Sequence, residues 1–90
     1  MAANNFFSHT GSDGSTPDGR ASRSGYTGGY WGENIAAGQS SAQAAVDSWM
    51  QSTSGHCENI MNGRYRVIGV GYAFSSSSAY KHYWTEDFGG

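Results

Sequence analysis

At 90 residues the chain is long enough for one domain, and an aromatic content of 14% indicates that it folds. Glycine and serine together make up about a third of the residues, a proportion otherwise typical of disordered segments. The formal net charge of −2 comes from few charges and leaves no basic stripe, so nucleic acid is not an expected partner. No apolar run approaches the roughly 18–20 residues of a membrane span. The single cysteine, Cys57, excludes an internal disulfide.

Residues 1–5 (Met1-Ala2-Ala3-Asn4-Asn5) have neither the basic start nor the apolar stretch of a signal peptide. An intracellular protein would fit this start. The segment also has the composition of a last helical turn that the two asparagines end. We therefore expect residues 1–90 to be a single domain that is incomplete at its N-terminus.

A short helix is expected to follow Thr16, which would be its N-cap, with Pro17 at the first helical position. Arg20 and Arg23 fall in its last turn, where cations interact well with the helix dipole. Gly25 can end the helix in the left-handed conformation.

A stronger helix is predicted over residues 41–52, capped by Ser40 or Ser41. Its apolar residues repeat at the spacing of one helical face: Ala42, Ala45, Val46 and Trp49. A helical turn over about 56–62 should bring Ile60 and Met61 inward and end at Gly63.

The C-terminal part alternates as β-strands do. From Tyr65 to Phe74, large side chains occupy one face, and Val67, Gly69, Gly71 and Ala73 form a flat face on which something should pack closely. Serines 75–78 form a loop, and residues 80–88 return as an antiparallel partner. A third strand near 31–37 completes a small sheet, and helices on its faces give an α+β fold.

Three segments set an ionisable side chain among large apolar ones. These are Phe6-Phe7-Ser8-His9-Thr10, Trp31-Gly32-Glu33-Asn34-Ile35-Ala36 and Ser54-Gly55-His56-Cys57-Glu58-Asn59-Ile60. If they converge in the fold, they build a pocket with two histidines and one carboxylate.

Six segments occur in one order that closely resembles the bacterial branch of the CAP superfamily, also called SCP domains, which includes cysteine-rich secretory proteins, antigen 5 and plant pathogenesis-related proteins. They are Phe6-Phe7-Ser8-His9-Thr10, Trp31 to Gly38, Ala45 to Met50, Gly55-His56-x-x-Asn59-Ile60-Met61, Gly69 to Ala73, and Tyr83-Trp84-Thr85-x-Asp87-Phe88-Gly89. The resemblance covers essentially the whole chain.

This resemblance implies an α-β-α sandwich with a central antiparallel sheet, and it implies export, because family members are mostly secreted or wall-associated. Family domains begin with a long helix, and residues 1–5 match its end. Without that helix we expect an exposed apolar patch, reduced stability and self-association.

The resemblance also implies a cleft. Animal and plant members carry two histidines and two glutamates, and by motif His9, Glu33 and His56 match three of them. The position of the second glutamate, three residues after the helix tryptophan, is Ser52. The set of four groups is therefore incomplete.

Three roles are open to His9, Glu33 and His56. Two imidazoles and a carboxylate suit Zn²⁺ or another divalent cation and leave a coordination position open. The same groups are candidates for general acid–base catalysis, with Glu33 orienting a histidine. A buried histidine–glutamate pair can also be purely structural.

Other candidates are weaker. Cys57 adjoins His56, but adjacent residues rarely face one reacting centre. No serine lies in a nucleophile-elbow sequence, and His82 is expected on a sheet face. The cluster of Tyr26, Tyr30 and Trp31 fits a core rim better than a sugar or lipid site.

We therefore expect an extracellular or envelope-associated binding module whose cleft, at His9, Glu33 and His56, holds a divalent cation or a small ligand, lipid or peptide. A metal-assisted hydrolase using the same residues is the rival. A protein-interaction module without a ligand is the third alternative.

Overall fold

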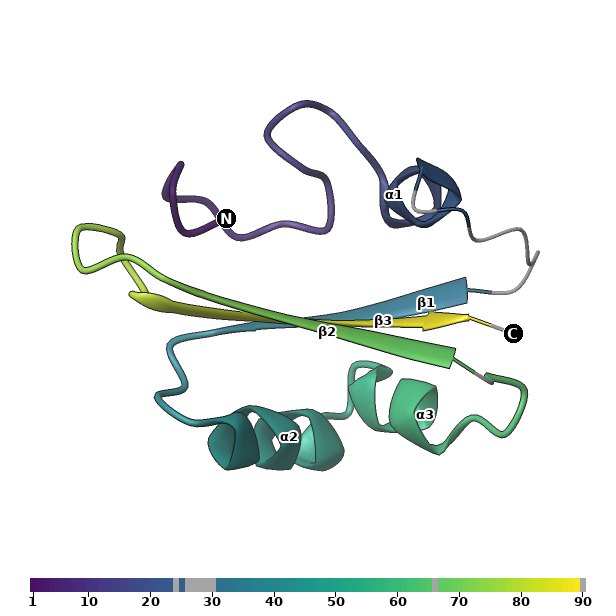
Figure 1. Ribbon diagram of the computed structural model, residues 1–90. Helices are drawn as coiled ribbons and strands as arrows, with labels where there is room; N and C mark the ends of the chain where they lie inside the picture. The colour runs from purple at the N-terminus through teal and green to yellow at the C-terminus, as the bar shows by residue number, and fades with distance from the viewer. Residues whose placement is uncertain (24, 26–30, 66, 90) are drawn as a thin grey trace.

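The computed structural model describes residues 1–23, 25, 31–65 and 67–89. A three-stranded antiparallel sheet lies between two layers (Figure 1). The N-terminal segment and α1 (Pro17–Arg23) lie over one face, which we call the N-terminal face. Helices α2 (Ala42–Gln51) and α3 (His56–Met61) lie over the other, the helical face. The prediction of an α+β domain with a small antiparallel sheet is confirmed.

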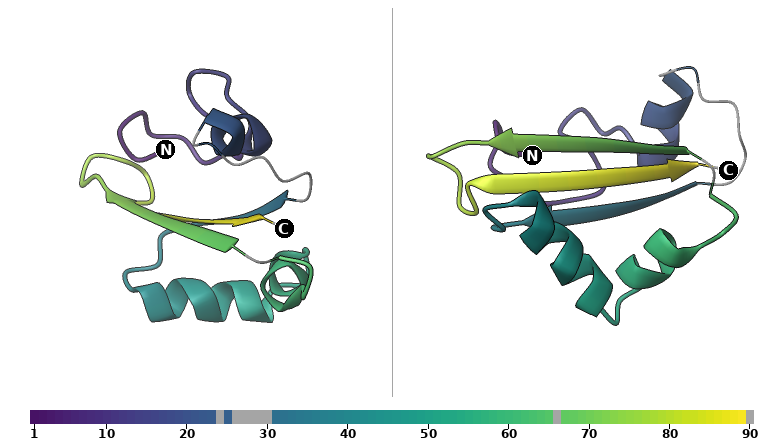
Figure 2. Two further views of the ribbon diagram at one scale, coloured as in Figure 1. Left: turned by 45° about the vertical axis from the view of Figure 1, so that its right-hand side comes forward. Right: turned by 60° about the horizontal axis from the view of Figure 1, so that its bottom comes forward.

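The sheet consists of β1 (Trp31–Ala37), β2 (Val67–Phe74) and β3 (His82–Gly89). Its order is β1-β3-β2, so β3 is central and the other two strands form opposite edges (Figure 2). The predicted β2–β3 hairpin and third strand are confirmed, although both hairpin strands begin two residues later than expected. Lys81, just before β3, has a positive φ of 66° and belongs to the turn.

The helix ends follow the capping residues in the sequence. The Thr16 hydroxyl accepts a hydrogen bond from the Gly19 N–H at 3.3 Å, and Ser41 Oγ accepts one from the Ala44 N–H at 3.1 Å. Gly25 is left-handed, with φ 92°. Side-chain oxygens therefore satisfy first-turn donors of α1 and α2, as predicted.

Residues 1–6 form a turn of the kind that ends helices. The Phe6 N–H donates to the Met1 carbonyl at 3.1 Å, and the Asn5 N–H donates to the Ala2 carbonyl at 3.3 Å. Asn5 is left-handed, with φ 51°. This pair of bonds around a left-handed residue is the Schellman pattern, in agreement with the expected conformation of residues 1–5.

The core lies between α2 and the sheet. Ala36, Ala45 and Trp49 form a buried cluster, against which Ile60 and Trp84 pack. The Trp49 indole N–H donates to the Ile35 carbonyl at 3.0 Å, so this aromatic side chain satisfies its polar atom while filling the core.

Several burial predictions were wrong. Ala42 and Val46 are exposed, because only the Ala45–Trp49 side of α2 faces the sheet. Met61 is 69% exposed, and Asn62 rather than Gly63 is the C-cap of α3.

The strand β2 also departs from expectation, because all eight of its residues are exposed. Its small residues were expected to lie under a closely packed neighbour. A Cβ atom added at Gly69 or Gly71 would meet nothing within 4 Å. The alternation of β2 was right, but neither face of this strand is covered by the described residues.

Candidate functional site

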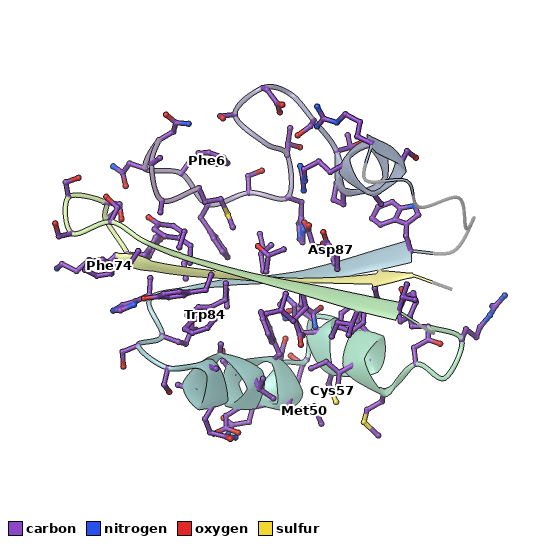
Figure 3. The ribbon with its side chains drawn as sticks, viewed as in Figure 1. Phe6, Met50, Cys57, Phe74, Trp84 and Asp87 are labelled. Atoms are coloured by element: carbon purple, nitrogen blue, oxygen red, sulfur yellow. The ribbon has the colours of Figure 1, made fainter. Side chains whose placement is uncertain are left out.

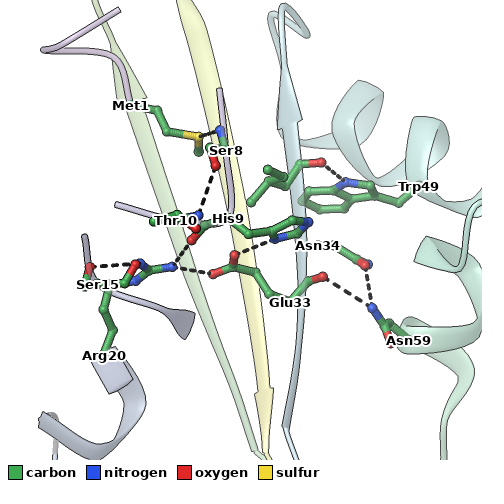
Figure 4. Close-up of polar contacts among 11 residues, drawn as sticks. Met1, Ser8, His9, Thr10, Ser15, Arg20, Glu33, Asn34, Trp49 and Asn59 are labelled. Atoms are coloured by element: carbon green, nitrogen blue, oxygen red, sulfur yellow. Dashed lines mark hydrogen bonds and ion pairs between the residues drawn. The ribbon is translucent and has the colours of Figure 1, made fainter. Parts of the chain in front are cut away.

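Glu33 is the centre of a polar cluster on the N-terminal face (Figure 4). Its side chain is 2% exposed. The His9 Nδ1–H donates to Glu33 Oε1 at 2.7 Å, and Arg20 Nη2 donates to Oε2 at 3.2 Å. Both carboxylate oxygens are thus bonded, which is how a buried charge is tolerated.

Arg20 holds this cluster together. From α1, its Nη2 also donates to the His9 carbonyl at 2.9 Å, and its Nη1 donates to the carbonyl and the hydroxyl of Ser15, both at 3.0 Å. One guanidinium therefore ties the N-terminal segment and the loop before α1 to Glu33 on β1.

A pocket of about 340 Å³ opens beside the cluster, between the N-terminal layer and the sheet. His9, Arg20, Glu33 and Asp87 are among its charged or titratable lining groups, and apolar lining comes from Met1, Phe6 and Ile35. This mixture of apolar wall and convergent polar groups is typical of small-molecule sites.

Asp87 is a second carboxyl group in this pocket. It is the direct cross-strand partner of Glu33, and Figure 3 shows it on the N-terminal side of the sheet. Burial, together with the neighbouring Glu33, raises the pKa of Asp87 to about 7, although Arg20 opposes the shift. Its Oδ1 is buried and has no hydrogen-bond partner in the described part of the chain.

His56 lies on the other side of the sheet, at the start of α3. Its Nδ1 is 2.7 Å from Ser52 Oγ. Both residues line a second pocket of about 290 Å³, which Phe7 and Trp49 also line. Ile35 lines this pocket and the first one, so the two pockets adjoin at β1.

Two asparagines, Asn34 and Asn59, connect β1 to α3. The Asn34 amide donates to the His56 carbonyl at 3.0 Å, and the Asn59 amide donates to the Glu33 carbonyl at 3.3 Å. Asn59 also donates to Asn34 Oδ1 at 2.9 Å. The main chain that carries Glu33 is thereby fixed to α3.

The structure thus brings two of the three predicted site residues into contact. His9 and Glu33 are bonded, whereas His56 contacts Ser52, which stands at the position expected for a second glutamate. Among the described residues, no group of three or more His, Cys, Asp or Glu side chains is placed to hold a metal ion. The described donor set does not fit a metal centre.

The other described residues considered as site candidates from the sequence lie outside the pocket of Glu33. Cys57 is a free, half-buried thiol. His82 lies on the helical face, where its Nδ1 is 2.9 Å from the Tyr72 hydroxyl. Trp31 is partly exposed at the rim, whereas Tyr26 and Tyr30 lie outside the described residues.

Sequence reasoning missed the roles of Arg20 and Asp87. Arg20 was noted only as a helix-terminal cation. Asp87 was noted only as part of a segment of the family resemblance. The sequence did not show whether Asp87 shares a sheet face with Glu33, because that depends on how β1 pairs with β3.

A small sheet between an N-terminal layer and two short helices, with a histidine–glutamate pair in a cleft, defines an SCP-type domain. The model of the cysteine-rich secretory protein (CAP) family matches residues 1–88. The chain belongs to this family.

Individual relatives agree. The uncharacterized protein YkwD of Bacillus subtilis (strain 168) is 46% identical over 57 residues, which are 63% of this chain and 20% of YkwD. An extracellular SCP-domain protein of Bacillus anthracis str. Ames, solved by crystallography, is 32% identical with a TM-score of 0.78, over 97% of this chain and 26% of that one.

The fold is also similar to an outer surface protein of Borrelia burgdorferi, at a TM-score of 0.79 and 24% identity, over 97% of this chain and 62% of that one. The chain therefore spans between a fifth and two thirds of the length of these relatives. In the described ranges, no helix is both long and apolar enough to cross a membrane.

Proposed function

We propose that this CAP domain is an exported binding module that holds a small ligand in the pocket beside His9 and Glu33, which adjoins the pocket of His56 at β1. The observation that carries the proposal is the buried Glu33 carboxylate, bonded on both oxygens beside a pocket of about 340 Å³. Buried charges are costly, and those held next to an open pocket are frequently functional.

The polar groups of the pocket indicate the chemistry of the ligand. Among the described residues, the buried Asp87 Oδ1 atom has no hydrogen-bond partner, and the His9 ring, about half exposed, lines the same pocket. An acceptor of this kind favours a ligand that donates hydrogen bonds. We infer a small neutral molecule with hydroxyl or amide groups, such as a sugar unit or a short peptide.

The second pocket extends the site. His56 and Ser52 offer polar groups there, and Phe7 and Trp49 offer apolar surface. Because Ile35 lines both pockets, a ligand with a polar part near His9 and an apolar part near Trp49 would contact both histidines.

A divalent cation is the alternative ligand, and it stays a prediction. The Arg20 guanidinium already bonds Glu33 Oε2 and competes with a cation for that oxygen. The metal-assisted hydrolase depends on the same cation. A neutral ligand therefore agrees better with the observed charge arrangement.

The experiment is an NMR titration with two neutral probes, N-acetylglucosamine and the capped dipeptide N-acetyl-alanyl-alanine amide, followed through the histidine ring signals. At least one probe is expected to shift the His9 and His56 signals together. In His9→Ala and His56→Ala we expect about tenfold weaker binding, as loss of one such hydrogen bond implies. His82→Ala is the matched control, because His82 lines neither pocket. Binding that is unchanged in both cleft variants contradicts the proposal.

Calorimetry with Zn²⁺ alone separates the alternative. Heat of binding that disappears in both His9→Ala and His56→Ala would establish the cation site instead. Chelator-sensitive peptide hydrolysis lost in the same variants would establish the hydrolase. No heat at millimolar Zn²⁺ removes both.

Export is also part of the proposal. It is supported by two structural neighbours described as an extracellular protein and an outer surface protein. Fractionation of cells that express the full-length gene product, followed by immunoblotting of medium, envelope and cytoplasm, tests it. Recovery in the cytoplasm alone would contradict it.

A further inference from the structure

The two edge strands of the sheet, β1 and β2, differ in whether side chains bond their outer backbone groups. At β1, the carbonyls of alternate residues accept hydrogen bonds from side chains. The Tyr65 hydroxyl donates to Trp31, the Asn59 amide to Glu33, and the Trp49 indole to Ile35, at 3.1, 3.3 and 3.0 Å respectively. Side-chain donors therefore occupy this edge and prevent another strand from pairing with it.

The edge at β2 has none of these features. In the described part of the chain, no side chain donates to its outer edge. Its sequence, Val67 to Phe74, contains no charge and no proline. Native proteins protect open edges with lysine, proline, bulges or covering segments, and within the described ranges β2 has none of these.

The side chains of β2 are also complementary to themselves. Ile68, Val70, Tyr72 and Phe74 form one apolar row, and each is at least 51% exposed. A two-fold axis normal to the sheet keeps each face on its own side, so even-numbered residues pair only with even-numbered residues. Centred on Gly71, the pairing places Ile68 opposite Phe74 and Val70 opposite Tyr72, without a charge on either strand.

We propose that β2 is a homodimerisation edge, at which two copies pair antiparallel and form one continuous six-stranded sheet. The occupant is a second copy because the edge is uncharged and matches itself in register. Backbone hydrogen bonds would supply the pairing, and the apolar row would be shielded from water where the strands meet.

The available area determines the strength. Fully burying an aromatic side chain removes roughly 150–250 Å² from water, so Tyr72 and Phe74 leave about 100 Å² each to bury. Pairing at the edge leaves the outer surface of this row open to water, so two such strands bury well under the roughly 1,200 Å² of the smallest stable interfaces. We therefore expect a reversible dimer that dissociates on dilution.

Sedimentation velocity over about 1–500 µM protein tests the proposal. The wild type is expected to shift from monomer to dimer. Val70→Lys is expected to weaken dimerisation at least tenfold, because each lysine would lie opposite Tyr72 in place of an apolar partner and the two charges would be diagonal neighbours across the axis. Val46→Lys, at an exposed valine on α2, is the matched control and should dimerise as the wild type does. Circular dichroism verifies that both variants remain folded.

Hydrogen exchange gives an independent measurement. Outward amides of β2 should become protected as the concentration rises, while those of β1 should not change. A monomer throughout the range, open-ended fibrils, or a dimer weakened by Val46→Lys rather than Val70→Lys would each overturn the proposal. None of these measurements depends on the ligand cleft.

Discussion

Replacing Glu33 with glutamine tests whether the His9–Glu33–Arg20 cluster stabilises the fold. Glutamine keeps the shape of the side chain but removes the charge, and its amide NH₂ group would face one of the two donors. The carboxylate now accepts bonds at 2.7 and 3.2 Å. Hydrogen bonds to charged groups contribute about 1.5–3 kcal/mol each.

The loss of stability depends on whether the N–H groups of His9 and Arg20 find other partners. The His9 side chain is 53% exposed and that of Arg20 is 32% exposed, so water can satisfy both after the substitution. We therefore expect a loss of about 2 kcal/mol rather than the sum of two full bonds. A 90-residue domain typically has about 5–13 kcal/mol of stability, so the loss should be easily measured.

The assay is urea unfolding followed by tryptophan fluorescence at neutral pH. Asp13→Asn is the control, because Asp13 and Arg23 lie 3.7 Å apart with both side chains more than 60% exposed. Exposed pairs of this kind contribute little to stability, because water and salt screen them. Equal effects of the two substitutions, or a Glu33→Gln effect below about 0.5 kcal/mol, would refute the reasoning.

Three further predictions concern stability. Trp49→Phe should cost about 1–3 kcal/mol in urea unfolding, because the buried Ile35 carbonyl loses its donor. Gly32→Ala should cost about 1–3 kcal/mol because the new methyl group clashes with the Tyr65 hydroxyl, and adding Tyr65→Phe should recover part of the loss. The raised pKa of Asp87 favours its neutral form in the folded state, so its contribution to stability is present below the ordinary pKa of 3.8 and is lost as the pH rises through about 7. Melting temperatures should therefore show wild type losing stability relative to Asp87→Asn between these pH values.

Each of these three stability predictions has a control measurement that can contradict it. Trp31→Phe, at a half-exposed tryptophan, should cost less than about 0.5 kcal/mol. Gly69→Ala should not introduce a clash, because nothing lies within 4 Å of the added carbon. A constant difference between wild type and Asp87→Asn across the pH range would show that Asp87 does not titrate with a raised pKa.

The sequence was most informative where structure is local. Thr16 and Ser41 predicted helix starts because their hydroxyls bond first-turn amides within three residues. Alternation from Tyr65 to Phe74 and the return strand expected over residues 80–88 predicted the hairpin. The family resemblance then indicated the layered fold and the cleft residues.

Local patterns failed wherever burial depended on a neighbour. The alternation of β2 showed which side chains share a face, and the structure shows both faces exposed. In the same way, helical periodicity grouped Val46 with Trp49, but only the tryptophan lies against the sheet. Periodicity describes one element, whereas burial depends on what packs against it.

By itself, then, the sequence determined the identity of most helices and strands and their ends to within about two residues, since capping and side-chain periodicity act over a few residues. Only the tertiary structure decided that Arg20 and Asp87 join Glu33, that His56 pairs with Ser52, and that β2 is an open edge. These outcomes depend on strand register and layer packing, which bring together residues as distant in the chain as Glu33 and Asp87, 54 positions apart.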